Sequence, residues 1–403
     1  MPKASQTLPV KPLKPRKVLS IGGPVAYHDV ALFYGFDPII KPQITKKDAV
    51  LAKKIYEIAG LHKSKTQQFA VPLEDKIALI RHLQETEDYD RESFPIHVHT
   101  INQEPQTGRS YVDLDIVGTE SSVAEAMLIR ATNAILSEDG YNDLQLYINS
   151  VGDKDSSQKF TRELYNFFKK KSSDLSPSCR QVLKRNVYDA LKCDHEKCVL
   201  VREEAPRSIS FLTEKSRQHF KEVLEFVETF DFPYKIHHPL LGHKAFCSQT
   251  IFEVRPMNSE SEEKPLAVGL RYDYLGRKMG YRKEIPSIGV RIFLKKAPST
   301  QKVVKTKDPQ IGFFHLGYES RLKSLSVLEL LRRGNISSFH TLSEEKLSSQ
   351  MHASQNQNIK YAIIMGQKEA LEHAVIVRDM STREQETVQI PELVGYLRDR
   401  IMS

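Results

Sequence analysis

Short apolar strands and amphipathic helices alternate through the last 94 residues of the chain, positions 310–403. The predicted strands are 311–316, 336–340, 360–365 and 373–379, and the predicted helices are 319–333, 341–351 and 391–401. Strands separated by helices at this spacing predict a small α/β domain with a mostly parallel sheet.

The part of the chain before this domain has a different pattern. Residues 96–101 and 111–117 alternate like a β-hairpin with its turn at Gln106–Gly108, and further strands are predicted at 144–148 and within 250–294. Helical spacing is found at 119–136 and 154–171, and Thr45 with Asp48 forms a capping-box pattern that opens a helix to about Gly60. We therefore predict an α+β core in which helices flank an antiparallel sheet.

Four segments follow from these patterns. Residues 1–17 form a basic, flexible arm, and residues 18–296 form the core. A polar, helix-rich insertion without strand signals interrupts the core at 172–235. Residues 297–309 have the Lys- and Pro-containing composition of a linker, and the α/β domain follows at 310–403.

The formal charge of +8 is unevenly distributed. The arm carries five basic residues and no acidic one, whereas residues 310–403 hold eleven of each sign. The folded part is therefore only mildly basic, and the arm is either a solubilising tail or a steering element for RNA. The chain contains no apolar run long enough to span a membrane and only four cysteines, which favours a reducing cytoplasm and no membrane partner.

A co-linear series of motifs then resembles the histidyl-tRNA synthetase family, a class II aminoacyl-tRNA synthetase family. Residues 34–42 are similar to motif 1, residues 104–118 to the motif 2 loop and strand, and residues 288–290 to the start of motif 3. Three further matches are LYINSVGD (146–153), TIFE (250–253) and GLRYD (269–273). The segment from Gly312 to Arg400 resembles the anticodon-binding domain of the family.

The resemblance implies an α/β protein with a class II synthetase-like core, whose antiparallel sheet has six or seven strands, and an anticodon-binding-like α/β domain. It also implies a homodimer formed through motif 1, where leaving the apolar residues around Phe33, Phe36 and 39–40 wet would cost about 25 cal/mol per Å². Members that activate histidine use ATP and Mg²⁺, and their domain plan implies tRNA or another RNA as a partner.

Activation of histidine needs cationic groups aimed at the α-phosphate of ATP, and the family supplies an arginine from each of three motifs. Alignment of those motifs with this chain finds other residue types at the catalytic positions. The degenerate positions are Ile101 in motif 2, Gly242, Ala245 and Phe246 in the histidine motif, and Lys296 in motif 3. Loss of one such contact commonly costs ~10²–10³ in rate, so we assign no catalytic residue and expect no cofactor.

Some positions keep the identities found in the family. The candidate ligand-binding residues are Glu74, Arg109, Arg271, Tyr272 and Asp273. A buried ion pair that braces the sheet is the favoured interpretation of Arg271 and Asp273. Arg109 is either a solvated turn residue or a surviving contact to phosphate or RNA.

A short cluster, Cys193-x-His195-x₂-Cys198, has residue types that bind metals. A structural zinc site needs four ligands, and no second pair follows at zinc-finger spacing. We therefore predict no metal site.

The leading hypothesis is a histidyl-tRNA synthetase-like protein that does not activate histidine and serves as a tRNA-binding, RNA-binding or regulatory module. An active, divergent histidine–tRNA ligase that uses ATP and Mg²⁺ is the first alternative. A protein–protein scaffold without RNA binding is the second, and the balanced charge of residues 310–403 favours it.

Overall fold

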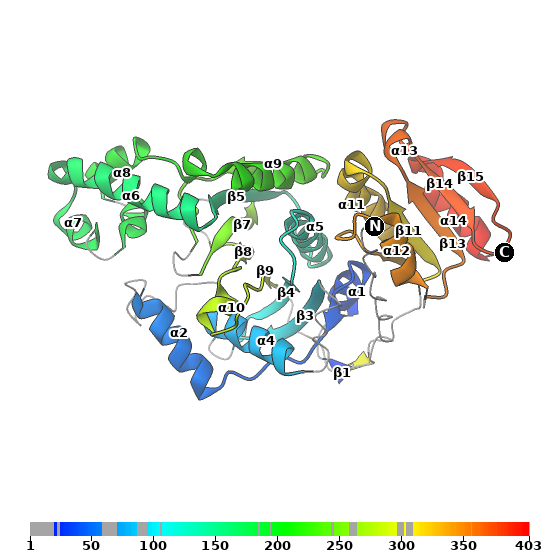
Figure 1. Ribbon diagram of the computed structural model, residues 1–403, viewed down its shortest axis with the longest axis horizontal. Coiled ribbons are helices and arrows are strands. Elements are labelled where there is room, and N and C mark those ends of the chain that lie inside the picture. Colours follow the sequence, from blue (N-terminus) through cyan, green and yellow to red (C-terminus); the bar gives the residue numbers. More distant parts are fainter. Residues whose placement is uncertain are drawn as a thin grey trace, which may run out of the picture.

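A computed structural model gives the fold of the chain (Figure 1). It describes residues 20–21, 25–58, 71–86, 95–104, 107–183, 186–193, 195–242, 246–257, 264–295, 302–303, 309–355 and 357–402. The predicted arm at 1–17 and most of the predicted linker lie outside the described residues.

An eight-stranded sheet lies at the centre of the molecule, with the strand order β2-β3-β4-β9-β8-β7-β5-β6. Its strands are β2 (Asp37–Pro38), β3 (Ile96–Gln103), β4 (Ser110–Val117), β5 (Leu144–Gly152), β6 (Tyr234–Ile236), β7 (Ser248–Pro256), β8 (Ala267–Arg271) and β9 (Ser287–Phe293). The strands from β3 to β5 are antiparallel, whereas β2 and β6 pair in parallel at the two edges. The prediction of six or seven strands missed these edges because they are too short to show an alternating pattern.

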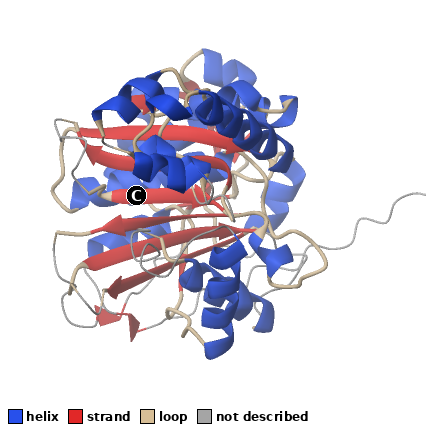
Figure 2. Ribbon diagram, turned by 90° about the vertical axis from the view of Figure 1, so that its left-hand side faces the viewer, coloured by secondary structure: helices blue, strands red, loops and turns tan. Residues whose placement is uncertain are grey.

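Helices cover both faces of this sheet (Figures 1 and 2). On one side α5 (Val123–Glu138) packs with α1 (Val25–Phe33) and α9 (Glu214–Glu228) on the apolar side chains of the central strands. We call this the α5 face. On the other side lie α2 (Lys46–Ile58), α4 (Leu73–Glu85) and α10 (Leu275–Lys278), and we call this the α4 face. Alternation along each strand sends neighbouring residues to opposite faces.

The capping-box prediction for α2 is confirmed by two reciprocal hydrogen bonds. The Thr45 backbone N–H donates to Asp48 Oδ2 at 2.8 Å, and the Asp48 N–H donates to Thr45 Oγ1 at 3.2 Å. Two further helices begin at polar caps that accept from backbone amides: Asp153 caps α6 (Lys154–Lys170), and Thr213 caps α9. The caps at Asp153 and Thr213 were not predicted from the sequence.

A helical insertion extends from one end of the sheet, at the left of Figure 1. After α6 it contains α7 (Pro177–Leu183), α8 (Glu196–Glu203) and the 3₁₀ turns η1 (Ser172–Asp174), η2 (Val187–Lys192) and η3 (Ser208–Phe211). These elements pack around a small core of their own, which includes Phe160, Phe168 and Leu191. Apart from the edge strand β6 at its end, the described residues of this region form helices, 3₁₀ turns and loops.

A second sheet, at the right of Figure 1, has the order β12-β11-β13-β14-β15. Its strands are β11 (Ile311–His315), β12 (Ser338–His340), β13 (Tyr361–Met365), β14 (Ala374–Asp379) and β15 (Gln385–Gln389), and its helices are α11 (Tyr318–Arg333), α12 (Leu347–Ser354), α13 (Gln367–Leu371) and α14 (Leu393–Met402), the last preceded by the 3₁₀ turn η4 (Ile390–Glu392).

The predicted mostly parallel sheet is wrong for this unit. The β11–β12 and β11–β13 pairs are parallel, whereas β13–β14 and β14–β15 are antiparallel. The turn between β14 and β15 is too short to hold the crossover helix that a parallel pair needs. The strand β15 escaped prediction because four of its five side chains are exposed, so it has no apolar signal.

The C-terminal unit shares a continuous apolar core with the α5 face of the central sheet. Helix α11 packs against α5 and α9. The buried Tyr34 hydroxyl donates to Glu329 Oε2 at 2.7 Å, and Arg332 Nη1 donates to Glu138 Oε1 at 3.0 Å. A short ribbon, β1 (Ser20–Ile21) with β10 (Lys302–Val303), lies below α1 in Figure 1.

The apolar residues that were expected to need a dimer partner are largely covered by the chain itself. Tyr34 and Phe36 are fully buried, and Phe33 is partly buried against the core. Ile40 is 72% exposed. Of the apolar residues named for the dimer, Ile40 and the partly covered Ile39 are therefore the ones whose exposure to solvent favours a partner subunit. The dimer itself stays a prediction.

Among the described residues, no helix is long and apolar enough to cross a membrane.

Candidate functional site

The α4 face carries buried charges where the α5 face carries aliphatic side chains. Along β4, Val112, Leu114 and Ile116 enter the core beneath α5. The alternate residues Asp113 and Asp115 point the other way and meet cations from α4 and β9. The pairing of these charges decides what this face of the sheet can bind.

One group on the α4 face joins Lys76, Asp115 and Tyr272. Lys76 Nζ donates to Asp115 Oδ1 at 2.6 Å, and the Tyr272 hydroxyl donates to the same oxygen at 2.8 Å. All three side chains are buried. Burial raises the pKa of Asp115 despite the attraction of Lys76, and it raises the pKa of Tyr272 well above its usual value. A Cβ added at Gly289 would lie 1.9 Å from Asp115 Oδ1, so only glycine fits on the neighbouring strand.

A second group is centred on Arg291 of β9. Its guanidinium donates to both oxygens of Asp113 at 2.8 and 2.7 Å and to Asp75 Oδ2 at 2.6 Å. It also stacks on the ring of Tyr111, with 4.0 Å from Cζ to the ring centroid. Lys41 completes the group at 2.9 Å from Asp75. Burial works to raise the pKa of Asp113, but Arg291 outweighs it and holds that pKa below its usual value.

The α5 face contains a buried ion pair of its own. Arg271 donates to Glu125 at 2.8 Å (Nε) and 2.6 Å (Nη2), to the Thr119 carbonyl at 2.8 Å and to Asp273 at 3.3 Å. Although burial opposes it, Arg271 lowers the pKa of Glu125 to about 2. Asp273 also accepts from the Ser248 hydroxyl and the Ser287 N–H. Arg271 and Asp273 thus connect β8 to α5 and to the segment before it.

The remaining ligand-binding candidates do not join these groups. Glu74 is half-buried in the first turn of α4 and has no hydrogen-bond or ion-pair partner among the described residues. Arg109 follows the β3–β4 turn and stacks on Phe293 at 4.4 Å. Of the five candidates, Arg271 and Asp273 are in contact, Tyr272 points to the opposite face, and Glu74 and Arg109 lie apart.

The degenerate positions are placed differently from one another. Ile101 lies opposite Val112 and belongs to the α5-face core, whereas Thr100 and Asn102 pair with Asp113 and Tyr111 of the α4 face. The residues that project from β3 towards the α4 face are therefore Thr100 and Asn102, and neither is an arginine. Counting from the turn could not distinguish the two faces of the strand.

The histidine-motif positions leave little space. A Cβ at Gly242 would meet Cys247 Sγ at 2.6 Å, so a larger side chain would displace its neighbours. Phe246 is buried in the apolar cluster beneath α4. Ala245 and Lys296 lie outside the described residues. Sequence reasoning missed Lys76, Asp113, Asp115 and Arg291, although a lysine or arginine on an apolar helix or strand pattern was an available signal.

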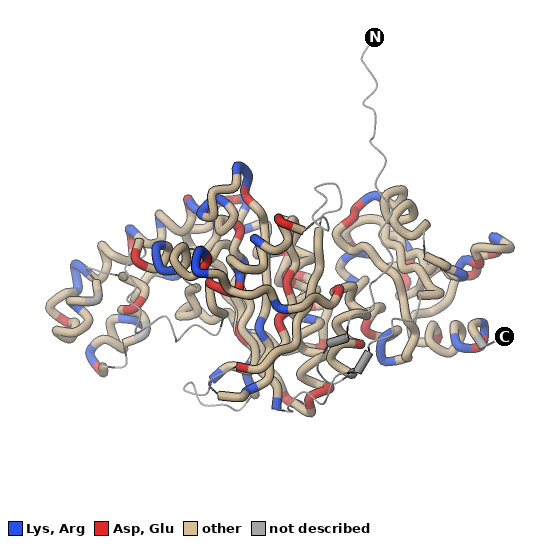
Figure 3. The backbone as a smooth tube through the Cα atoms, turned by 90° about the horizontal axis from the view of Figure 1, so that it is seen from below, with Lys and Arg blue, Asp and Glu red and all other residues tan. Residues whose placement is uncertain are grey.

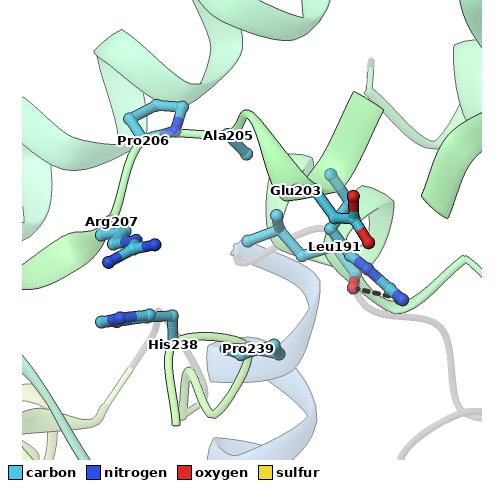
Figure 4. Close-up of a pocket in the computed structure, with 8 residues that line it drawn as sticks. Leu191, Glu203, Ala205, Pro206, Arg207, His238 and Pro239 are labelled. Carbon is cyan, nitrogen blue, oxygen red and sulfur yellow. Dashed lines mark hydrogen bonds between the residues drawn. The ribbon is translucent and has the colours of Figure 1, made fainter. Parts of the chain in front are cut away.

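A pocket of ≈ 350 Å³ opens between the insertion and the loop after β6 (Figure 4). The side chains of Arg207 and His238 lie next to each other on one side, and Leu191 and Glu203 lie on the other. Burial and the nearby Arg207 lower the pKa of His238, which favours the neutral ring. This pocket lies outside both charged groups of the sheet.

The insertion also brings Cys179 to Cys193 and Cys198, which lie further along the sequence. The sulfur atoms of Cys179, Cys193 and Cys198 lie within 4.8 Å of one another. Sequence reasoning considered Cys193 and Cys198 and missed Cys179, because no zinc-finger spacing links it to them. The approach of α7 to η2 supplies the third thiol.

Comparison with known proteins gives the following matches. A family model described as an anticodon binding domain matches residues 316–400. The histidine–tRNA ligase of Dehalococcoides mccartyi is 24% identical over 306 residues, which cover 74% of this chain and 73% of that protein. The corresponding ligase of Oceanobacillus iheyensis is 26% identical over 312 residues, covering 74% and 72%. A crystal structure of apo histidyl-tRNA synthetase from S. aureus matches with a TM-score of 0.49 at 19% identity, covering 92% of this chain and 93% of that one.

Proposed function

We propose that the chain is a divergent member of the histidyl-tRNA synthetase family that keeps the fold of these enzymes without activating histidine. Its role is that of a binding module, with tRNA or another RNA held through the C-terminal domain. In this proposal the two charged groups of the α4 face are structural.

The charge pairing on the α4 face carries the proposal. Transfer to the α-phosphate of ATP needs fixed cations that point at empty space, where negative charge develops in the transition state. Lys76 and Arg291 are 2–3% exposed and are held by Asp115, Asp113 and Asp75 at 2.6–2.8 Å. A phosphate that entered here would compete with carboxylates already bound to the guanidinium and ammonium groups, and would meet their negative charge.

The histidine-motif positions support the same conclusion. A residue that binds the substrate imidazole or the α-phosphate must project into the cleft, but Gly242 has no side chain and packs against Cys247. Phe246 is apolar and buried. Polar recognition gives sharp discrimination between substrates, so an apolar replacement removes specificity for histidine.

Histidine-dependent ATP–pyrophosphate exchange tests the catalytic half of the proposal. We expect exchange at the background level. The histidine–tRNA ligase of Dehalococcoides mccartyi serves as the positive control. Exchange well above background would overturn the proposal. In that case Arg291→Met should abolish it, and Arg277→Met should not, because Arg277 is an exposed residue of α10 without an ion-pair partner among the described residues.

The proposed RNA binding is assigned to residues 316–400, which match the model of an anticodon binding domain. Basic and acidic residues alternate along it without one dominant sign (Figure 3), so affinity must come from shape and base contacts as well as from phosphates. We expect the full-length protein to bind tRNA with an affinity that falls as salt rises, since each phosphate contact adds roughly 0.7–0.9 to the logarithmic slope.

Deletion of residues 1–17 gives the matched control for this measurement. If the C-terminal domain binds RNA, the deleted protein keeps a preference for tRNA over a random RNA of equal length. Binding that vanishes with the arm, or that shows no preference, would favour the alternative of a protein–protein scaffold.

A further inference from the structure

The three-cysteine cluster lies at the junction of the short elements in the insertion. Cys179 is in the first turn of α7, Cys193 follows η2, and Cys198 is in the first turn of α8. Cys179 and Cys198 are buried, and Cys193 is partly exposed. The geometry points to a metal site: we propose that the thiolates of Cys179, Cys193 and Cys198 bind one zinc-class ion. This replaces our expectation that the chain has no metal site.

The distances between the sulfur atoms fit this ion. Zinc–sulfur bonds of about 2.3 Å in a tetrahedron place the sulfurs about 3.8 Å apart. The three sulfurs lie within 4.8 Å of one another, so side-chain adjustments of an ångström or less would bring them to ligand positions. Thiolates are soft ligands and select zinc over magnesium or calcium. His195, the exposed N-cap residue of α8, or a water molecule would take the fourth position.

The surroundings of Cys198 resemble those of a metal-bound thiolate. The Ser176 backbone N–H points at Cys198 Sγ at 3.4 Å, and N–H donors of this kind orient and stabilise ligating sulfur. The Ser176 hydroxyl also accepts from the Cys179 backbone N–H at 3.3 Å. A single residue therefore positions two of the proposed ligands.

A metal ion would stabilise the insertion, because the helices of the insertion are short. The helices α7 and α8 have seven and eight residues, which is too short for stability on their own. Units of this size usually need a disulfide, a metal or a partner surface. The small insertion core holds Cys179 and Cys198 among its apolar residues, so an ion there would tie α7, η2 and α8 together.

Metal analysis of the full-length protein tests the site. After purification without chelators and in a reductant free of metal, we expect about one zinc ion per chain. Cobalt(II) added to the metal-free protein should give thiolate-to-cobalt charge-transfer absorption and the strong visible bands of tetrahedral coordination. Less than about a tenth of an ion per chain, together with no cobalt–thiolate absorption, would overturn the proposal.

Two serine variants locate the ligands. Cys179→Ser should lose more than about nine-tenths of the bound zinc, because the alcohol is a far weaker ligand than the thiolate. Cys247→Ser is the control: this cysteine is buried beside Gly242 at the sheet, and its variant should keep the full zinc content. Equal zinc content in both variants would contradict the assignment. If Cys179→Ser fails to fold, the cobalt spectrum of the unmodified chain still decides, since a disulfide among these cysteines would give no such absorption.

Discussion

The α5 face of the central sheet buries aliphatic and aromatic side chains around the Arg271–Glu125 pair, whereas the α4 face buries two charged groups beneath α4. Both faces are formed by the same alternating strands, so the difference lies entirely in which residue types occupy odd and even positions. The α5 face is a core in the ordinary sense. The α4 face buries an apolar cluster together with charged side chains that neutralise each other.

The largest loss of stability is expected when the Arg271–Glu125 ion pair of the α5 face is broken. Arg271→Leu leaves Glu125 buried and without its main cation, and should lower the free energy of unfolding by about 3–5 kcal/mol. Denaturant unfolding followed by circular dichroism measures this. Arg277→Leu, at an exposed site, is the control and should stay within about 0.5 kcal/mol. Similar losses in both variants would contradict a bracing role.

Acid titration sharpens the same comparison. The pKa of Glu125 is lowered to about 2, so its stabilising effect is complete above the unfolded value of 4.5 and is lost as the pH falls towards 2. This contribution is worth about 3 kcal/mol at neutral pH. Unfolding measured from pH 6 to pH 2 should show a steeper loss in the wild type than in Glu125→Gln. Parallel curves would contradict the shift.

On the α4 face, Lys76→Met should cost about 3 kcal/mol at pH 7, because it leaves the buried Asp115 with Tyr272 as its only described donor. Burial raises the pKa of Asp115, and loss of Lys76 raises it further. A group with a raised folded pKa stabilises the fold more as the pH falls, so the deficit of this variant should shrink from pH 7 to pH 5. Denaturant unfolding at the two pH values measures this, and a deficit that stays constant would contradict it.

The double variant Lys76→Met/Asp115→Leu removes both charges and tests whether the α4 face needs them. We expect its stability to return to within about 1 kcal/mol of the wild type, since apolar side chains often replace a buried ion pair without loss. If the double variant is less stable than Lys76→Met, the α4 face depends on its charges as the α5 face depends on Arg271.

The smallest effect is expected at the rim. Arg109→Ala removes one cation–π contact to Phe293 and should cost about 0.5–1 kcal/mol in the free energy of unfolding. The conservative variant Arg109→Lys keeps the positive charge and should recover part of this loss. A cost above about 2 kcal/mol for Arg109→Ala would show that Arg109 belongs to the buried network rather than to the surface.

Local signals in the sequence predicted the helices and strands that depend on them. The Thr45–Asp48 capping box, the hairpin of β3 and β4, and the strand–helix alternation of the C-terminal unit all form as expected. The edge strand β15 carries no apolar pattern, so its place and the mixed sheet had to come from the structure.

The sequence predicted less of the candidate site than of the helices and strands. The face to which Ile101 points depends on register, and an error of one residue moves a side chain to the other side of the sheet. The pairing of Arg291 with Asp113 and Asp75 joins residues more than 170 positions apart. The approach of Cys179 to Cys193 and Cys198 likewise arises from helix packing in the insertion, and no spacing rule encodes it.

The apolar core that α11 shares with the central unit restricts the motion of the C-terminal unit relative to the central sheet. Tyr34 inserts its hydroxyl towards Glu329 from the opposite unit, and aromatic and aliphatic side chains of both units fill one continuous interior. A spectroscopic label on α14 should therefore report the slow tumbling of the entire particle rather than the fast wobble of a tethered module. Any RNA bound to the C-terminal unit would therefore keep a fixed orientation relative to the central sheet.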